Sequence, residues 1–242
     1  MDNFNFNVVN DRQPQTAAVS KTFISSVFSW MAAALAITAI VAYQFGANPD
    51  YMSILRNPAG GSSILGFIIM LAPLGFIMII SGGFQKFSYP TLLSLFLAFS
   101  VVMGMSLSYI FLRYTASSIY QTFGVASAMF GLMALVGYTT KTDLTKLGSL
   151  LFMGLIGIIL ASVVNMFMHS GGLQYIISFL GVIIFTGLTA YDVQKLKEIG
   201  SQVEEGSQTA SKIVIMGALT LYLDFINIFL FLLELFGGRR RR

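Results

Sequence analysis

Residues 173–194 read LQYIISFLGVIIFTGLTAYDVQ, and residues 213–235 read IVIMGALTLYLDFINIFLFLLEL. Both stretches are apolar on nearly every face and are long enough to cross a bilayer, since a hydrocarbon core of about 30 Å needs about 20 helical residues. Each stretch nevertheless contains an aspartate, Asp192 in the first and Asp224 in the second. An ionised carboxylate in hydrocarbon costs several kcal/mol, so these aspartates must pair, take up a proton or line water.

The rest of the chain has the same apolar character. Hydrophobic residues make up 56% and charged residues 10% of it, and the mean hydropathy is +0.79, which indicates an integral membrane protein. Barrel strands alternate polar and apolar residues, whereas these runs do not, so the predicted fold class is all-α. The apolar runs predict seven transmembrane helices, at about 23–45, 63–82, 90–112, 116–138, 147–168, 173–194 and 213–235.

The loops are too short for a second domain, so one seven-helix membrane domain is expected over residues 23–236. It is flanked by a polar tail, residues 1–22, and a basic tail, residues 237–242. The sequence from His169 to Gly172 is expected to separate the fifth and sixth helices. Asp192 lies closer than Asp224 to the loop that joins their helices, so we expect the sixth helix to continue beyond the membrane through residues 193–199.

Lysine and arginine residues predict the orientation, because they concentrate in cytoplasmic loops. Eight lie on the amino-terminal side, against two on the other side if the terminal run Arg239 to Arg242 is left out. This places the amino terminus in the cytoplasm of a multi-pass protein of the bacterial inner membrane. The terminal arginines then lie outside as a lipid-binding end, or inside if the last segment is re-entrant.

Three blocks of sequence resemble the Bax inhibitor-1 family, also known by the transmembrane Bax inhibitor motif. The blocks are TGLTAYDVQKL at residues 186–196, GMSLSYI at 104–110 with Tyr114-Thr115 and Ser118-Ile119 after it, and ALTLYLDFIN at 218–227. Their order and spacing, over almost the whole chain, identify it as a bacterial member. The resemblance implies a last helix that is central in a seven-helix bundle and a pH-sensitive calcium leak. It also places the family's paired aspartates on Asp192 and Asp224.

One feature departs from the family pattern. In some bacterial relatives a basic residue at the end of the second helix pairs with the first aspartate, and an acidic residue lies within that helix. Here the second span carries no charge from Ile64 to Ile80. Lys86, in the loop that follows, has two interpretations: it replaces the missing basic partner of Asp192, or it is an ordinary solvated lysine.

The chemistry of the pair also follows from the residues themselves. Two carboxylates at low dielectric cannot both ionise cheaply, so they titrate as a unit that shares one proton or binds a hard cation such as calcium. Calcium takes six to eight oxygen ligands, so two aspartates form only a weak, transient site. Asn227 is expected to add an amide oxygen, and Tyr191 and Tyr222 to donate hydrogen bonds to the carboxylates.

Other polar residues have simpler explanations. Arg113 is read as a lipid-phosphate anchor or an external gate residue, and Glu234 as a solvated residue at the end of the last span. His169 is a candidate pH sensor or an ordinary interfacial residue. The chain has no cysteine, so thiolate metal sites are excluded, and one histidine cannot hold zinc alone. No cofactor is expected beyond calcium as the permeant ion, and the scattered basic residues predict no nucleic-acid binding.

Two other classes of function remain open. Intramembrane aspartyl proteases also use two aspartates, the first in a Tyr-Asp pair such as Tyr191-Asp192. This chain has Leu-Tyr-Leu-Asp at residues 221–224 instead of their Gly-x-Gly-Asp, and it lacks their Pro-Ala-Leu. A non-conducting regulator that binds other membrane proteins is the third class. The expected function is a non-enzymatic calcium leak channel whose partners are lipid, calcium and protons, with Asp192 and Asp224 as sensor and ion path.

Overall fold

The structure, a computed structural model, describes residues 12–57, 61–204 and 206–238. Seven segments in these ranges are long and apolar enough to cross a membrane, with α4 and α5 forming one crossing, which confirms the predicted all-α class. Of the two expected tails, residues 1–11 and 239–242 lie outside the described residues, and α1 begins at Arg12, within the first tail. The helices are α1 (Arg12–Ala47), α2 (Pro49–Leu55), α3 (Ile64–Gly83), α4 (Tyr89–Leu107), α5 (Ile110–Arg113), α6 (Ala116–Thr139), α7 (Thr145–Met168), α8 (Gly171–Gln202) and α9 (Gln208–Phe236).

Short hydroxyl side chains begin most of the spanning helices. Each accepts a hydrogen bond from a backbone N–H of the first turn, which would otherwise lack a partner. The capping residues are Ser63, Ser88, Thr115, Ser170 and Ser207.

The break expected between the fifth and sixth spans is also present. α7 ends at Met168, and His169 adopts a left-handed backbone conformation with φ 52°, which turns the chain into α8.

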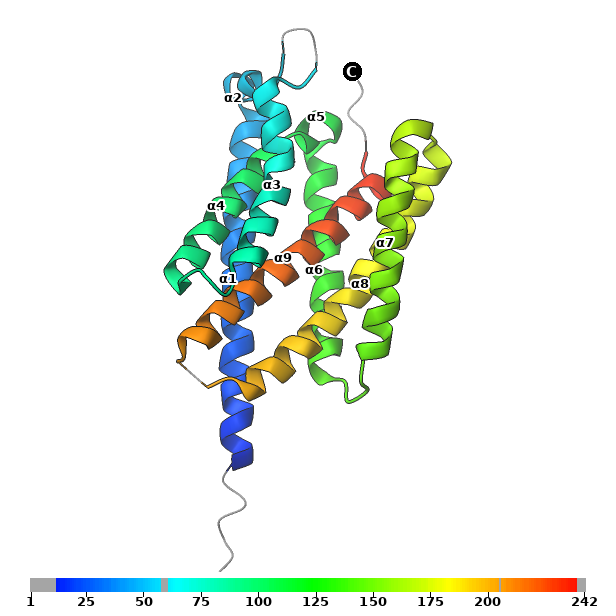
Figure 1. The fold of residues 1–242 in the computed structure, drawn as a ribbon. Coiled ribbons are helices and arrows are strands. Elements are labelled where there is room, and N and C mark those ends of the chain that lie inside the picture. The colour runs from blue at the N-terminus through cyan, green and yellow to red at the C-terminus, as the bar shows by residue number, and fades with distance from the viewer. Residues whose placement is uncertain (1–11, 58–60, 205, 239–242) are drawn as a thin grey trace, which may run out of the picture.

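The last helix crosses the whole bundle. At its end Gly238 donates to Ser118 Oγ at 2.8 Å and accepts from the Thr115 N–H at 3.0 Å, so it lies beside the start of α6. Figure 1 shows this end of the molecule, with α2, α5 and the end of α9, opposite the α6–α7 and α8–α9 loops. α9 therefore runs from one end of the bundle to the other without turning back within it. We call these two ends the C-terminal end and the lysine-rich end, because the second carries Lys141, Lys146, Lys195, Lys197 and Lys212.

α9 is central, and α8 lies beside it. Figure 1 shows both helices running obliquely through the bundle, and α9 packs against α1, α4, α6 and α8. α3 and α7 are the spans with the least buried surface, and they present apolar side chains outward. α8 has 32 residues, or about 48 Å, and so exceeds the membrane core as expected from residues 193–199.

Helices α6 and α8 touch at a glycine. A Cβ added to Gly137 would lie 2.1 Å from the carbonyl oxygen of Ala190, which is a backbone atom that cannot move aside cheaply. The absence of a side chain therefore lets the two backbones approach, as is common between helices in membranes.

We expect Gly137→Ala to lower the stability of the protein by about 1–3 kcal/mol, because the added methyl group forces α6 away from α8. Gly131→Ala is the matched control, since it lies in the same helix and faces open space. Thermal unfolding of the purified proteins in detergent measures the difference. Equal melting temperatures for the two variants would contradict the close approach.

Candidate functional site

The most extensive helix contact in the described residues is the one between α8 and α9. The residues of α9 on this seam recur every seven positions, at Gly217, Asp224 and Phe231. Seven residues are close to two helical turns, so these three residues lie on one face of α9. These three positions define three layers of contact between α8 and α9. In the first layer, a Cβ added to Gly217 would lie 2.6 Å from Leu196 of α8, so this layer is on the lysine-rich side of the aspartates.

The middle layer of the seam holds the two aspartates. The carboxyl group of Asp192 on α8 lies within hydrogen-bonding reach of that of Asp224 on α9. Asp224 is 4% exposed, and its Oδ2 is buried with no hydrogen-bond donor among the described residues. Because ionised carboxylates only accept hydrogen bonds, this contact becomes a hydrogen bond only when a proton is shared. A cation between the two groups is the other way to compensate them.

A basic residue of α8 itself lies near the pair. Lys195 is the cation whose charge acts on Asp192, and its Nζ lies 5.7 Å from the ring centre of Tyr191. Lys86 is exposed in the turn after α3, and no ion pair joins it to Asp192 in the described part of the chain.

Asn227 lies one turn beyond Asp224 on α9 and is half-buried. Its Nδ2 donates to the carbonyl oxygen of Leu223 at 2.7 Å. Its Oδ1 is an acceptor of the kind that hard cations use.

The two tyrosines have other partners than the carboxylates. Tyr222 is fully buried, and its hydroxyl lies 2.7 Å from Thr38 Oγ1 of α1, which in turn donates to the carbonyl oxygen of Ser100. Tyr191 packs against α7, where a Cβ on Gly148 would meet its ring at 2.6 Å. Tyr222 therefore holds α9 to α1 and α4, an anchoring role that sequence alone did not reveal because Thr38 is 184 positions away.

Long-range contacts also hold the extension of α8 in place. Gln194 bridges the α6–α7 loop, donating to the Thr142 carbonyl oxygen and accepting from the Leu144 N–H, both at 2.8 Å. Lys197 donates to the carbonyl oxygen of Tyr138 at 2.7 Å. Gln194 and Lys197 lie two and five residues beyond Asp192, so these contacts hold the turn of α8 that carries Asp192 at a fixed depth.

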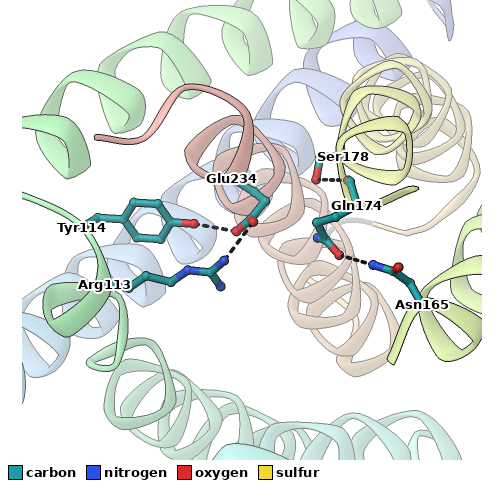
Figure 2. A network of polar contacts seen from close by, with 6 residues as sticks. All are labelled: Arg113, Tyr114, Asn165, Gln174, Ser178 and Glu234. Atoms are coloured by element: carbon teal, nitrogen blue, oxygen red, sulfur yellow. Dashed lines mark hydrogen bonds and ion pairs between the residues drawn. The ribbon is translucent and has the colours of Figure 1, made fainter. Parts of the chain in front are cut away.

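A second polar group lies at the C-terminal end of the bundle, where Figure 2 shows Glu234 facing the α5–α6 turn. Glu234 accepts from Arg113 at 3.0 Å and from the Tyr114 hydroxyl at 2.5 Å. Its side chain is 15% exposed, against 54% for Arg113, so Glu234 is partly buried and paired rather than simply surrounded by solvent. Nearby, Asn165 donates to Gln174 at 3.0 Å.

Two cavities open beside this group. One of about 420 Å³ lies between α5, α7, α8 and α9, and one of about 310 Å³ lies between α5, α8 and α9. Both are lined by Arg113, Gln174 and Glu234. His169 lines the larger one and is exposed.

Comparison with known proteins assigns the chain to a family. The model of the family described as inhibitor of apoptosis-promoting Bax1 matches residues 20–241. The inner membrane protein YbhL of Escherichia coli K12 is 44% identical over 232 residues, which cover 96% of this chain and 97% of YbhL. An uncharacterized protein of Borreliella burgdorferi is 43% identical, over 95% of this chain and 97% of its own. This protein is therefore a membrane protein of the Bax inhibitor-1 family.

Proposed function

We propose that this protein is a pH-sensitive calcium leak channel that is gated by Asp192 and Asp224. The observation that carries the proposal is the direct contact between the two carboxyl groups inside a membrane bundle, with an oxygen of Asp224 left without a donor. Acidic residues within membrane spans commonly mark ion or proton pathways. Membership of the Bax inhibitor-1 family supports the same function.

In this proposal, protonation of the aspartate pair opens and closes the path. When the pair holds one shared proton, the two carboxyl groups bind each other and offer little charge to a cation. When that proton leaves, two negative charges face each other at low dielectric and repel unless a cation lies between them. Conduction therefore requires the deprotonated pair, and acid closes the path.

The pair suits a cation in transit better than a stored one. No three His, Cys, Asp or Glu side chains come together within the described residues. A calcium ion at the pair would take its remaining oxygen ligands from the Asn227 amide, backbone carbonyls and water. Weak coordination of this kind lets an ion leave as readily as it enters.

The excess of lysines at one end supports an orientation. We infer that the lysine-rich end and the amino terminus lie in the cytoplasm of a bacterial inner membrane, the location named for YbhL. Asp192 then lies toward the cytoplasmic side of the seam, and the cavities beside Glu234 open outward.

The other two classes of function are separated from a channel by one set of vesicle experiments. A channel conducts calcium in vesicles that contain only this protein, a protease cleaves a helical peptide, and a regulator does neither. Burial favours the channel over the protease, because Asp224 is 4% exposed and is flanked in the chain by Leu223 and Phe225 rather than by glycines.

We expect calcium flux into proteoliposomes to fall as the pH is lowered from about 8 to about 5, because the pair then holds its shared proton. In Asp192→Asn and Asp224→Asn the amide donates a permanent hydrogen bond to the remaining carboxylate. Flux in these variants should be low and should change little with pH. A calcium-sensitive dye inside the vesicles measures it.

Asp143→Asn provides the control for these variants. Asp143 lies outside the spans, and hydrogen bonds from the side chain and backbone of Thr145 hold the pKa of this carboxyl below its usual value. It stays ionised over the tested range, so its substitution should leave the pH dependence intact. A native pH profile in both variants of the pair would remove the proposed gate.

The orientation has its own test. A periplasm-active reporter such as alkaline phosphatase should be active when fused after Gly238 and inactive when inserted in the loop at Gly206. The reverse pattern would show that the lysine-rich end faces outward.

A further inference from the structure

The two cavities at the C-terminal end form a vestibule, defined here by the residues that line both of them: Arg113, Gln174 and Glu234. The lining of the larger cavity is mainly polar, with Ser162, Asn165, His169 and Ser170 contributing. A polar recess at the end of an apolar bundle can hold water and hydrated ions. Glu234 contributes a carboxylate close to the point where α9 ends.

A polar stripe leads from this vestibule toward the aspartates. Asp224, Asn227, Phe231 and Glu234 are spaced by three, four and three residues along α9, and this spacing keeps them on one face. All but Asp224 are half-buried. Phe231 is the single apolar member of this series.

Phe231 is packed across the seam. A Cβ added to Gly181 of α8 would lie 2.6 Å from its ring, and the ring centres of Phe231 and Phe185 are 5.9 Å apart. Phe231 also lines the smaller cavity, so one side of it faces the vestibule. Along the same face of α9, Phe231 lies between Asn227 and Glu234.

We propose that cations enter from the vestibule and that Phe231, seated on Gly181 and beside Phe185, is an outer gate in series with the aspartate pair. A ring of apolar side chains stops ions by excluding water, without any charge. The identity of calcium as the ion rests on the function proposed above, whereas the water route past Phe231 does not.

The contacts of Glu234 position this gate. Arg113 and Tyr114 hold Glu234 to the α5–α6 turn, and Gly238 is bound to Thr115 and Ser118. These contacts fix the last turn of α9, one turn from Phe231. Displacement of the α5–α6 turn would therefore move the ring away from Gly181.

The absence of cysteine from the sequence permits a direct test with single-cysteine variants. Gln174→Cys reports on the vestibule, and Asn227→Cys reports on the seam below the gate. The probe is trimethylammonium-ethyl methanethiosulfonate, a membrane-impermeant cation, added to the outside of intact cells. We expect Gln174→Cys to react readily and Asn227→Cys to react slowly. Adding Phe231→Ala should speed the reaction of Asn227→Cys by about tenfold or more, because water then fills the constriction.

Two controls make the comparison specific. Phe229→Ala removes an equal ring from the same helix, but Phe229 packs against Phe123 of α6, so the reaction of Asn227→Cys should stay slow. Ile228→Cys lies next to Asn227 and is fully buried off the stripe, so it should stay unreactive even with Phe231→Ala. If Phe231→Ala does not reach the membrane, Phe231→Leu replaces it and should give a smaller acceleration.

Three results would overturn the proposal. They are an unreactive Gln174→Cys, an Asn227→Cys that reacts as fast as Gln174→Cys with Phe231 in place, and an Asn227→Cys that stays slow when Phe231 is replaced. These readouts are independent of calcium. Acceleration by Phe231→Ala in a protein that conducts no calcium would refute the proposed channel function and leave the route past Phe231 standing.

Discussion

The structure depends on the contact between two carboxyl groups that α8 and α9 bring together within the membrane. Asp224 is almost completely buried, so its charge has no water to solvate it and must be compensated by Asp192 through a proton or by a cation. The two compensations exclude each other. A site with two states, whose balance depends on pH and on the cation concentration, is the physical basis of the gate proposed above.

The surrounding bundle holds these groups at the same depth. Glycines at Gly137, Gly181 and Gly217 let helix backbones or large side chains approach α8 and α9 closely. Tyr222 is bound to Thr38, so the α9 turn that carries Asp224 is tied to α1. Gln194 and Lys197 fasten the extension of α8 to α6 and its following loop. The aspartates are thus set in rigid elements rather than in loops, and a change of charge between them acts on helix packing.

The seam between α8 and α9 holds a second feature besides the aspartate pair. Polar residues recur along α9 from Asp224 to Glu234, but Phe231 interrupts them where it packs on Gly181. In the proposed channel, the charge at the aspartates and the exclusion of water at Phe231 are separate barriers that respond to different changes. The ion pair and tyrosine contact of Glu234 link the last turn of α9, next to Phe231, to the α5–α6 turn.

The sequence by itself determined the class of fold, the seven spans, the break at His169 and the extension of α8, because these follow from hydropathy and from local backbone preferences. It also singled out Asp192 and Asp224, because a charge inside an apolar run is visible without any structure. Only the tertiary structure decided which distant side chains meet. Thr38 contacts Tyr222, and Arg113 contacts Glu234, although each pair is separated by more than a hundred residues in the sequence. The contacts of Gly238 show that α9 crosses the whole bundle. Such pairs depend on how helices rotate and tilt against each other, and that is set by packing over the whole bundle rather than by any local pattern.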